Sequence, residues 1–232
     1  MQILNEGGNV FKGPDGAEAT QRINQADVEP TLKWLEKITG INHVDFMLGS
    51  TGIKPTSGDL DVAVDKEKVN KDALVGKLKA WKDKNAPKDD DRAWIAKSGI
   101  SVHFKTPING DAKNGFVQTD LMFGDPKFMQ FALRGAADSE FKGQHRMIMI
   151  ASVAKAQGYK WSPTNGLVDR ITNEPVTKDP NEVAKILLGD NASADDMRSV
   201  ETINAKIKTD PNYENLVKDA KDYFEKDGLK LP

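Results

Sequence analysis

Two stretches of the chain, residues 59–65 and 116–123, alternate between hydrophobic and more polar residues. Alternate residues of a strand point to the same face, so each stretch predicts a strand with one face turned to the core. The opposite faces carry three carboxylates, from Asp59, Asp61 and Asp120. The core-facing residues are Leu60, Val62 and Val64 in the first stretch and Val117, Thr119, Leu121 and Phe123 in the second. Further strands are expected around residues 100–104 and in an apolar stretch that ends at Leu48.

Hydrophobic residues spaced three and four apart predict helices that surround these strands. The first begins at Asp27, which can cap free N–H groups, and ends at Gly40. Each of three Asp-Pro pairs places a capping acid before a proline that suits the first helical position, and so predicts a helix start. These pairs are residues 125–126, 179–180 and 210–211, and other helices are expected over 70–84, over 139–157 and from Ser193 onward.

The order of these elements predicts an α/β (α+β) chain in which helices flank the strands, with a C-terminal helical extension. Residues 1–26, rich in glycine, predict an irregular N-terminal arm, and residues 27–135 hold the sheet. Residues 136–190 begin with the helix expected over 139–157, which ends before Gly158. Residues 191–232 predict a helical hairpin.

Composition narrows the classes of protein that this chain can belong to. It has 232 residues, 29% charged and 38% hydrophobic, and no apolar run approaches the roughly 18 residues that span a bilayer. Without cysteine it has no disulfide and no thiolate zinc site, and the absence of a secretory pattern at the first residues makes the cytoplasm the expected location. A net charge of −2 argues against a large nucleic-acid-binding surface, so any contact with DNA or RNA should be weak and local.

The carboxylates of Asp59 and Asp61 are the first candidates for chemistry. Two acids on one strand face repel each other unless a cation neutralises them, and Mg²⁺ characteristically takes one or two carboxylates together with phosphate oxygens. Gly49 and Ser50 precede them in a small-residue turn. Such a turn lets backbone N–H groups and the serine hydroxyl approach a phosphate closely. The pattern predicts a metal-bound nucleotide.

The segment from Gly49 to Asp61 resembles the signature of the DNA polymerase beta-like nucleotidyltransferase superfamily, in which Gly-Ser and a spacer precede Asp-hydrophobic-Asp. The spacer, with Ser57-Gly58, is most similar to the family X DNA polymerase catalytic core. Residues 154–189 resemble the closing part of that core, which implies that residues 136–190 form a polymerase-like helix and a hairpin that begins at Tyr159. The resemblance implies a nucleotidyltransferase fold with a small mixed sheet flanked by helices, in which residues 27–135 are a palm-like catalytic domain and Asp120 is a third metal ligand. It further implies two Mg²⁺ or Mn²⁺ ions on the three acids and a nucleoside triphosphate bound at Gly49, Ser50, Lys54 and Ser57.

The implied activity is transfer of a nucleoside monophosphate from an NTP or dNTP to an acceptor hydroxyl, a nucleic-acid 3′ end by resemblance, with release of pyrophosphate. The chain departs from family X at several positions. Lys54 stands where an arginine usually contacts the triphosphate, Met147 and Ala151 fall near the base-reading positions, and the N-terminal helical domain is expected to be absent. Two alternatives remain, a nucleotidyltransferase that modifies a protein or small molecule and a catalytically silent binding protein of the same fold.

Overall fold

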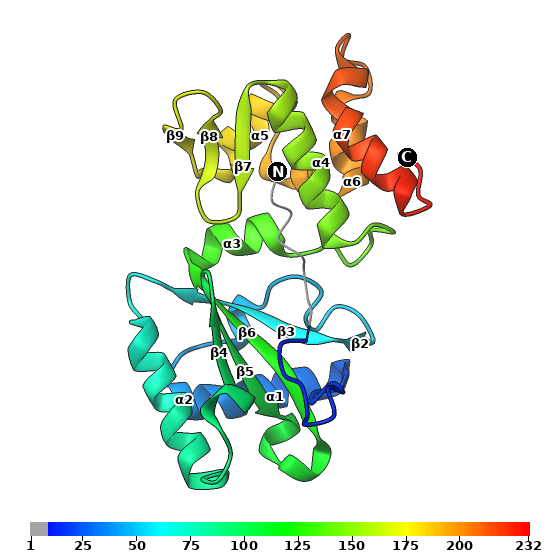
Figure 1. Ribbon diagram of the computed structural model, residues 1–232. Coiled ribbons are helices and arrows are strands. Elements are labelled where there is room, and N and C mark those ends of the chain that lie inside the picture. Colours follow the sequence, from blue (N-terminus) through cyan, green and yellow to red (C-terminus); the bar gives the residue numbers. More distant parts are fainter. Residues whose placement is uncertain (1–8) are drawn as a thin grey trace. The chain divides into compact units, whose positions relative to one another are not determined.

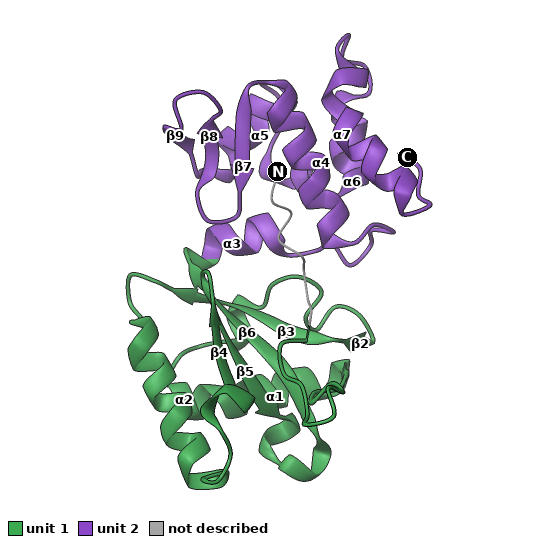
Figure 2. Cartoon of the chain, viewed as in Figure 1, with its two compact units in different colours: residues 1–126 green, residues 127–232 purple. Residues whose placement is uncertain are grey.

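The computed structural model of the protein describes residues 9–232 (Figure 1). The chain divides into two compact units, Met1–Pro126 and Lys127–Pro232, which Figure 2 colours separately and which we call unit 1 and unit 2. Each unit has a hydrophobic cluster of its own. The finer division that the sequence suggests, into residues 1–26, 27–135, 136–190 and 191–232, stays a prediction.

Unit 1 is built on a four-stranded sheet with the order β3-β6-β5-β4. The strands are β3 Asp59–Asp65, β4 Ile95–Ser98, β5 Ser101–Pro107 and β6 Phe116–Gly124. Strands β3 and β6 run parallel while the other neighbours run antiparallel, so the sheet is mixed. The parallel register places Asp61 directly beside Asp120.

Two helices, α1 Gln25–Thr39 and α2 Lys71–Asn85, contribute to the same hydrophobic core as the sheet. Alternate residues of β3 point to one face, and those on its hydrophobic face are fully buried in this core. They are Leu60, Val62 and Val64, and they lie in the same cluster as Leu32 of α1 and Leu78 of α2. Helix α2 begins after Asn70, whose side chain accepts hydrogen bonds from two backbone N–H groups of the first turn.

Helix α1 begins two residues earlier than the sequence predicts. Asn24 holds the cap position, and the Asp27 carboxylate instead accepts a hydrogen bond from the Asn109 side chain. Within the expected irregular arm, Ile23–Asn24 forms strand β1, which pairs with β2 Thr56–Ser57, and Phe11 is 1% exposed. The first eight residues of that arm lie outside the described residues.

The prediction of a strand that ends at Leu48 is wrong. Residues Val44–Phe46 form a 3-10 turn, and one bridge, between Met47 and Val62, follows it. The Glu36 carboxylate accepts hydrogen bonds from the backbone N–H groups of His43 and Val44, which holds the segment in a turn where its hydrophobic residues still reach the core.

Unit 2 is mainly helical and includes a small three-stranded sheet. Helix α3 begins at the boundary between the units, and Asp179 caps α5 as predicted, by accepting from the N–H groups of Asn181 and Glu182. The elements are α3 Pro126–Leu133, α4 Gly143–Ala156, β7 Tyr159–Ser162, β8 Gly166–Asp169, β9 Pro175–Thr177, α5 Pro180–Leu188, α6 Val200–Ile207 and α7 Tyr213–Lys226.

Helix α7 begins at Tyr213, two residues after the start that Asp210-Pro211 predicts. Helices α4 and α6 also differ from the sequence prediction, because side chains take over backbone hydrogen bonds. Helix α4 starts at Gly143 rather than Ser139, since the Ser139 hydroxyl and the Glu140 N–H both donate to Glu201. The single helix expected from Ser193 is a short 3-10 turn followed by α6, with Ser199 as the cap of α6. The predicted class, an α/β chain with a small mixed sheet flanked by helices and a helical C-terminal segment, is confirmed.

Candidate metal centre

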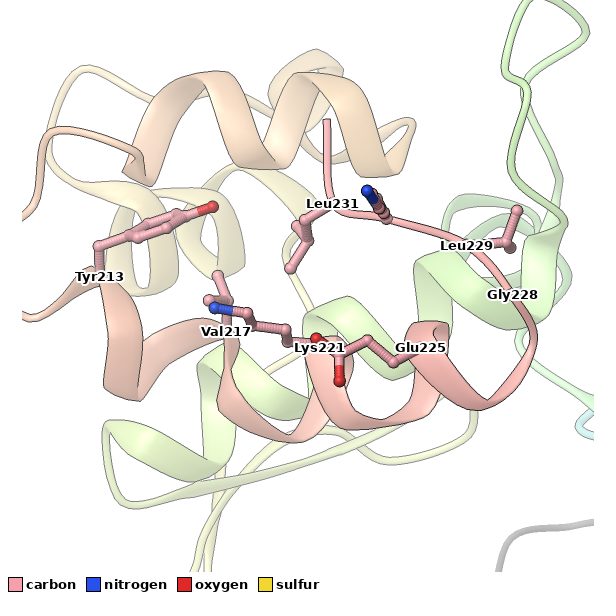
Figure 3. A pocket seen from close by; sticks show the side chains of 8 residues that line it. Tyr213, Val217, Lys221, Glu225, Gly228, Leu229 and Leu231 are labelled. Atoms are coloured by element: carbon pink, nitrogen blue, oxygen red, sulfur yellow. The ribbon is translucent and has the colours of Figure 1, made fainter.

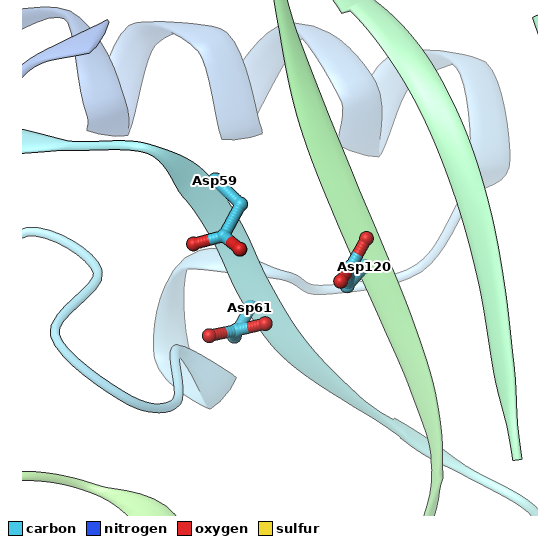
Figure 4. Close-up of side chains that lie close together, drawn as sticks. All are labelled: Asp59, Asp61 and Asp120. Atoms are coloured by element: carbon cyan, nitrogen blue, oxygen red, sulfur yellow. The ribbon is translucent and has the colours of Figure 1, made fainter. Parts of the chain in front are cut away.

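Three carboxylates converge on the sheet of unit 1 (Figure 4). Asp59 and Asp61 lie two residues apart on β3 and therefore on one face, and Asp120 stands beside Asp61 on β6. One carboxylate oxygen from each residue lies within 4.8 Å of the others, and all three residues are partly exposed. Divalent cations such as Mg²⁺ prefer oxygen ligands of this type, so the donor set fits such an ion.

The surroundings of Asp59 raise its affinity for a proton. Burial raises the pKa of Asp59 above its usual value, and the negative charge of Asp120 raises the pKa further. A backbone hydrogen bond and the positive charge of Arg22 act in the opposite direction. A divalent cation among the three oxygens would remove the repulsion, which is a second reason why these residues fit one.

Asp120 is held by two side chains that the sequence did not single out as part of a site. Both His103 Nδ1, at 2.7 Å, and Gln118 Nε2, at 3.0 Å, are hydrogen-bonded to Asp120 Oδ1. His103 is the cross-strand partner of Asp120 in the antiparallel pairing of β5 with β6. The alternation along β6 already places Gln118 on the face of Asp120, but the register that brings His103 there is set only by the folded sheet.

The turn at Gly49 and Ser50 lies against the acids. Gly49 has φ +53°, and a Cβ added there would stand 2.8 Å from Asp61 Oδ2. The turn is fastened to β3 because Leu48 N–H donates to the Asp61 carbonyl and Asp61 N–H donates to the Thr51 hydroxyl. Only glycine gives the backbone this close approach to a carboxylate at positive φ.

The remaining residues predicted to bind nucleotide occupy different environments. Ser50 and Lys54 are exposed. Ser57 is 2% exposed, and its Oγ is buried with no hydrogen-bond partner in the described structure. A ligand arriving from solvent would therefore meet Ser50 and Lys54 but not the Ser57 hydroxyl.

Arg22 is a further residue near the acids, and it comes from the segment predicted to be an irregular arm. Its Nε and Nη2 donate to Thr56 Oγ1 at 3.1 and 3.0 Å, and Nη2 also donates to the Thr56 carbonyl. These bonds hold the exposed guanidinium beside the start of β3, where its charge lowers the pKa of Asp59. Arg22 reaches this position because β1 pairs with β2. The amino-acid composition of the arm does not reveal such a contact between distant segments.

Unit 2 has a cavity of about 530 Å³ along α7 and the C-terminal segment (Figure 3). Its lining includes Tyr213, whose hydroxyl already donates to Asn204, and Lys221, which pairs with Glu214. Among residues 9–232, Asp59, Asp61 and Asp120 are the one group of three or more metal-ligand side chains whose ligand atoms lie within 4.8 Å of one another. None of these three acids lines the cavity of unit 2.

The comparisons with known proteins leave the family of this chain open. No family model matches the chain, and no curated protein matches it. A similar solved structure is the crystal structure of Leishmania infantum polymerase beta in a ternary P/T complex, which is 12% identical over 77% of each chain with a TM-score of 0.47. A likeness of that strength carries no functional argument. Over residues 9–232, no helix combines the length and the apolar character that crossing a membrane requires.

Proposed function

We propose that the protein is a metal-dependent nucleotidyltransferase that uses Asp59, Asp61 and Asp120. The observation that carries the proposal is the convergence of three carboxylate oxygens within 4.8 Å of one another, with the Gly49 turn against Asp61. Carboxylates that share divalent ions with substrate phosphates, beside a backbone turn that can cradle those phosphates, are the elements that phosphoryl transfer requires. The sequence resemblance to the polymerase beta-like superfamily points to the same chemistry.

In the proposed reaction an acceptor hydroxyl oxygen loses its proton to water and attacks the α-phosphorus of a nucleoside triphosphate, the bond from that phosphorus to the bridging oxygen breaks, and pyrophosphate leaves. Asp59 and Asp61 would hold both divalent ions, Mg²⁺ or Mn²⁺, and Asp120 the ion on the acceptor side. These ions, when bound, lower the pKa of the acceptor hydroxyl and offset charge on the phosphates. The Gly49 and Ser50 turn would donate hydrogen bonds to the outgoing phosphates.

Two cations of the chain complete the phosphate site in this proposal. Lys54 is exposed just after the turn, and as an ammonium it offers a point charge rather than the two-pronged contact of arginine. Arg22 provides a guanidinium that is already held beside the acids by Thr56. We propose Arg22 as the stronger phosphate contact, in place of the arginine that the sequence lacks after Gly49-Ser50.

The proposed acceptor is a nucleic-acid 3′ end, and the test is a direct transfer assay. Labelled NTPs and dNTPs are offered with Mg²⁺ or Mn²⁺ to primed DNA, to RNA and to protein acceptors. We expect short, poorly templated extension of a 3′ end. Labelling of a protein or metabolite with no labelled nucleic acid would favour the alternative acceptor class, which the net charge of −2 also suits. No transfer to any acceptor would leave a silent binding protein as the better account.

Replacement of a single acid tests whether the site performs the reaction. Asp61→Asn should lower the rate by on the order of a thousandfold, because metal-held charge dominates this chemistry. The matched control is Asp65→Asn, which changes the same side chain on the same strand. The Asp65 carboxylate instead accepts from Glu67 N–H and pairs with Lys68, and the control should retain activity. Full activity in Asp61→Asn would refute the assignment.

A further inference from the structure

We propose that His103 and Gln118 are positioning residues that fix the Asp120 carboxylate so that its second oxygen, Oδ2, is presented to a divalent cation. The inference rests on the proposed function, since it concerns a ligand of the proposed metal centre. We call His103 and Gln118 the Asp120 clamp. Both of its hydrogen bonds end on the same oxygen, Oδ1, at 2.7 and 3.0 Å. Two donors from different directions oppose rotation of the carboxylate and leave the lone pairs of Oδ2 for another partner.

The chemistry of the groups sets the direction of each bond. An ionised carboxylate only accepts hydrogen bonds, so the His103 imidazole donates through Nδ1–H. The orientation of the Gln118 amide follows from its other contact, because its Oε1 accepts from Val10 N–H at 2.8 Å. The amide nitrogen of Gln118 must then face Asp120. A continuous series of donors thus runs from the Val10 backbone through Gln118 to Asp120.

The backbone makes the clamp stiff. His103 and Asp120 are directly opposed in the antiparallel pairing of β5 and β6, and Gln118 precedes Asp120 by two residues on the same face of β6. His103 is 9% exposed and Gln118 is 2% exposed, so water competes little for these bonds. Partners of this kind orient the ligands of metal sites, and their loss typically weakens metal binding.

The test compares Mn²⁺ affinity in variants of the full chain, measured by electron paramagnetic resonance of free Mn²⁺ without nucleotide, with every variant in the same buffer. His103→Leu removes the donor, and His103→Asn keeps an N–H near the position of Nδ1. Ser101→Ala is the matched control, because Ser101 lies two residues before His103 on the same face of β5 and is equally exposed, at 9%. Thermal unfolding and circular dichroism show whether each variant is folded.

We expect His103→Leu to bind Mn²⁺ roughly 10- to 100-fold more weakly than the wild type, while His103→Asn stays within roughly threefold of it. Ser101→Ala should match the wild type. A purely structural role would lower the stability of both His103 variants without separating their Mn²⁺ affinities. If His103→Leu fails to fold, the comparison of Gln118→Leu with the wild type, where the same 10- to 100-fold loss is expected, decides the matter.

Two results overturn the inference while leaving the proposed function intact. One is a folded His103→Leu protein with wild-type Mn²⁺ affinity, and the other is an equal loss in His103→Leu and His103→Asn. The proposed function fails separately, and this inference with it, if the wild-type protein neither binds Mn²⁺ nor transfers a nucleotide.

Discussion

Acidification from pH 7 to pH 5 should destabilise unit 1 through His43. This residue is fully buried, and its Nε2 lies 2.9 Å from the Thr39 hydroxyl. That hydroxyl donates its single hydrogen to the Leu35 carbonyl, so it accepts from His43 Nε2–H. His43 Nδ1 is then the unprotonated nitrogen, and it is buried without a partner in the described structure. Protonation would create a buried N–H with no acceptor.

The size of the effect follows from the pKa of His43. Burial lowers this pKa from 6.5 to about 4, and the negative charge of Glu36 opposes the shift in part. Lys77, which donates to the Thr39 carbonyl, is a second charged group nearby. Because the unfolded chain takes up the proton first, the stabilisation is complete above pH 6.5 and is lost as pH falls toward 4. Linkage gives a loss of about 2 kcal/mol at pH 5 relative to pH 7.

Urea unfolding at pH 7 and pH 5 measures this loss. Tryptophan fluorescence is a suitable probe, since Trp34, Trp81 and Trp94 lie in unit 1 and one tryptophan lies in unit 2. The comparison protein is His43→Gln, whose side-chain amide can keep the donor toward Thr39 and does not titrate. Other groups titrate equally in both proteins, so the difference between the two pH effects isolates His43. An equal loss of stability in wild type and His43→Gln would refute the reasoning.

Three further predictions follow from the site and from unit 2. Gly49→Ala should weaken Mn²⁺ binding about tenfold or more, because the left-handed backbone costs about 1–2 kcal/mol without glycine and the new Cβ would meet Asp61. Mn²⁺ titration checks this, and the control Gly99→Ala, at φ +51° with open space around it, should bind as the wild type does. Arg22→Leu should raise the KM for the nucleoside triphosphate about tenfold in steady-state kinetics, and an unchanged KM would remove Arg22 from the phosphate site. Arg146→Met should lower the unfolding free energy by about 3 kcal/mol in chemical denaturation, since the buried guanidinium donates to four backbone carbonyls, and a near-neutral result would contradict this.

Local patterns in the sequence predicted the parts of the site that one strand can define. The alternation of residues 59–65 fixes Asp59 and Asp61 on one face, and the structure buries the other face completely. The placement of Asp120 came from its own strand together with a family resemblance, and the parallel register brings it beside Asp61. The roles assigned to Gly49, Ser50, Lys54 and Ser57 stay predictions.

What the sequence did not predict depends on contacts between distant segments. His103 reaches Asp120 through the register of β5 with β6, and Arg22 reaches the acids through β1 pairing with β2. Helix starts shifted for the same reason, as at Ser139, where Glu201 binds the residues that precede α4. Hydrophobic spacing locates a segment that can be helical, but such tertiary partners decide where the helix begins.

The parallel pairing of β3 with β6 determines when Asp59, Asp61 and Asp120 come together during synthesis of the chain. In the described sheet β3 pairs only with β6, apart from the bridge to Met47, and β4, β5 and α2 lie between them in the sequence. A nascent chain that has emerged from the ribosome only as far as β5 carries two of the acids on a strand with no sheet neighbour. Pairing across so long a loop is slow relative to local contacts. A divalent ion held by all three acids, as proposed, can therefore stabilise unit 1 only after β6 has been added.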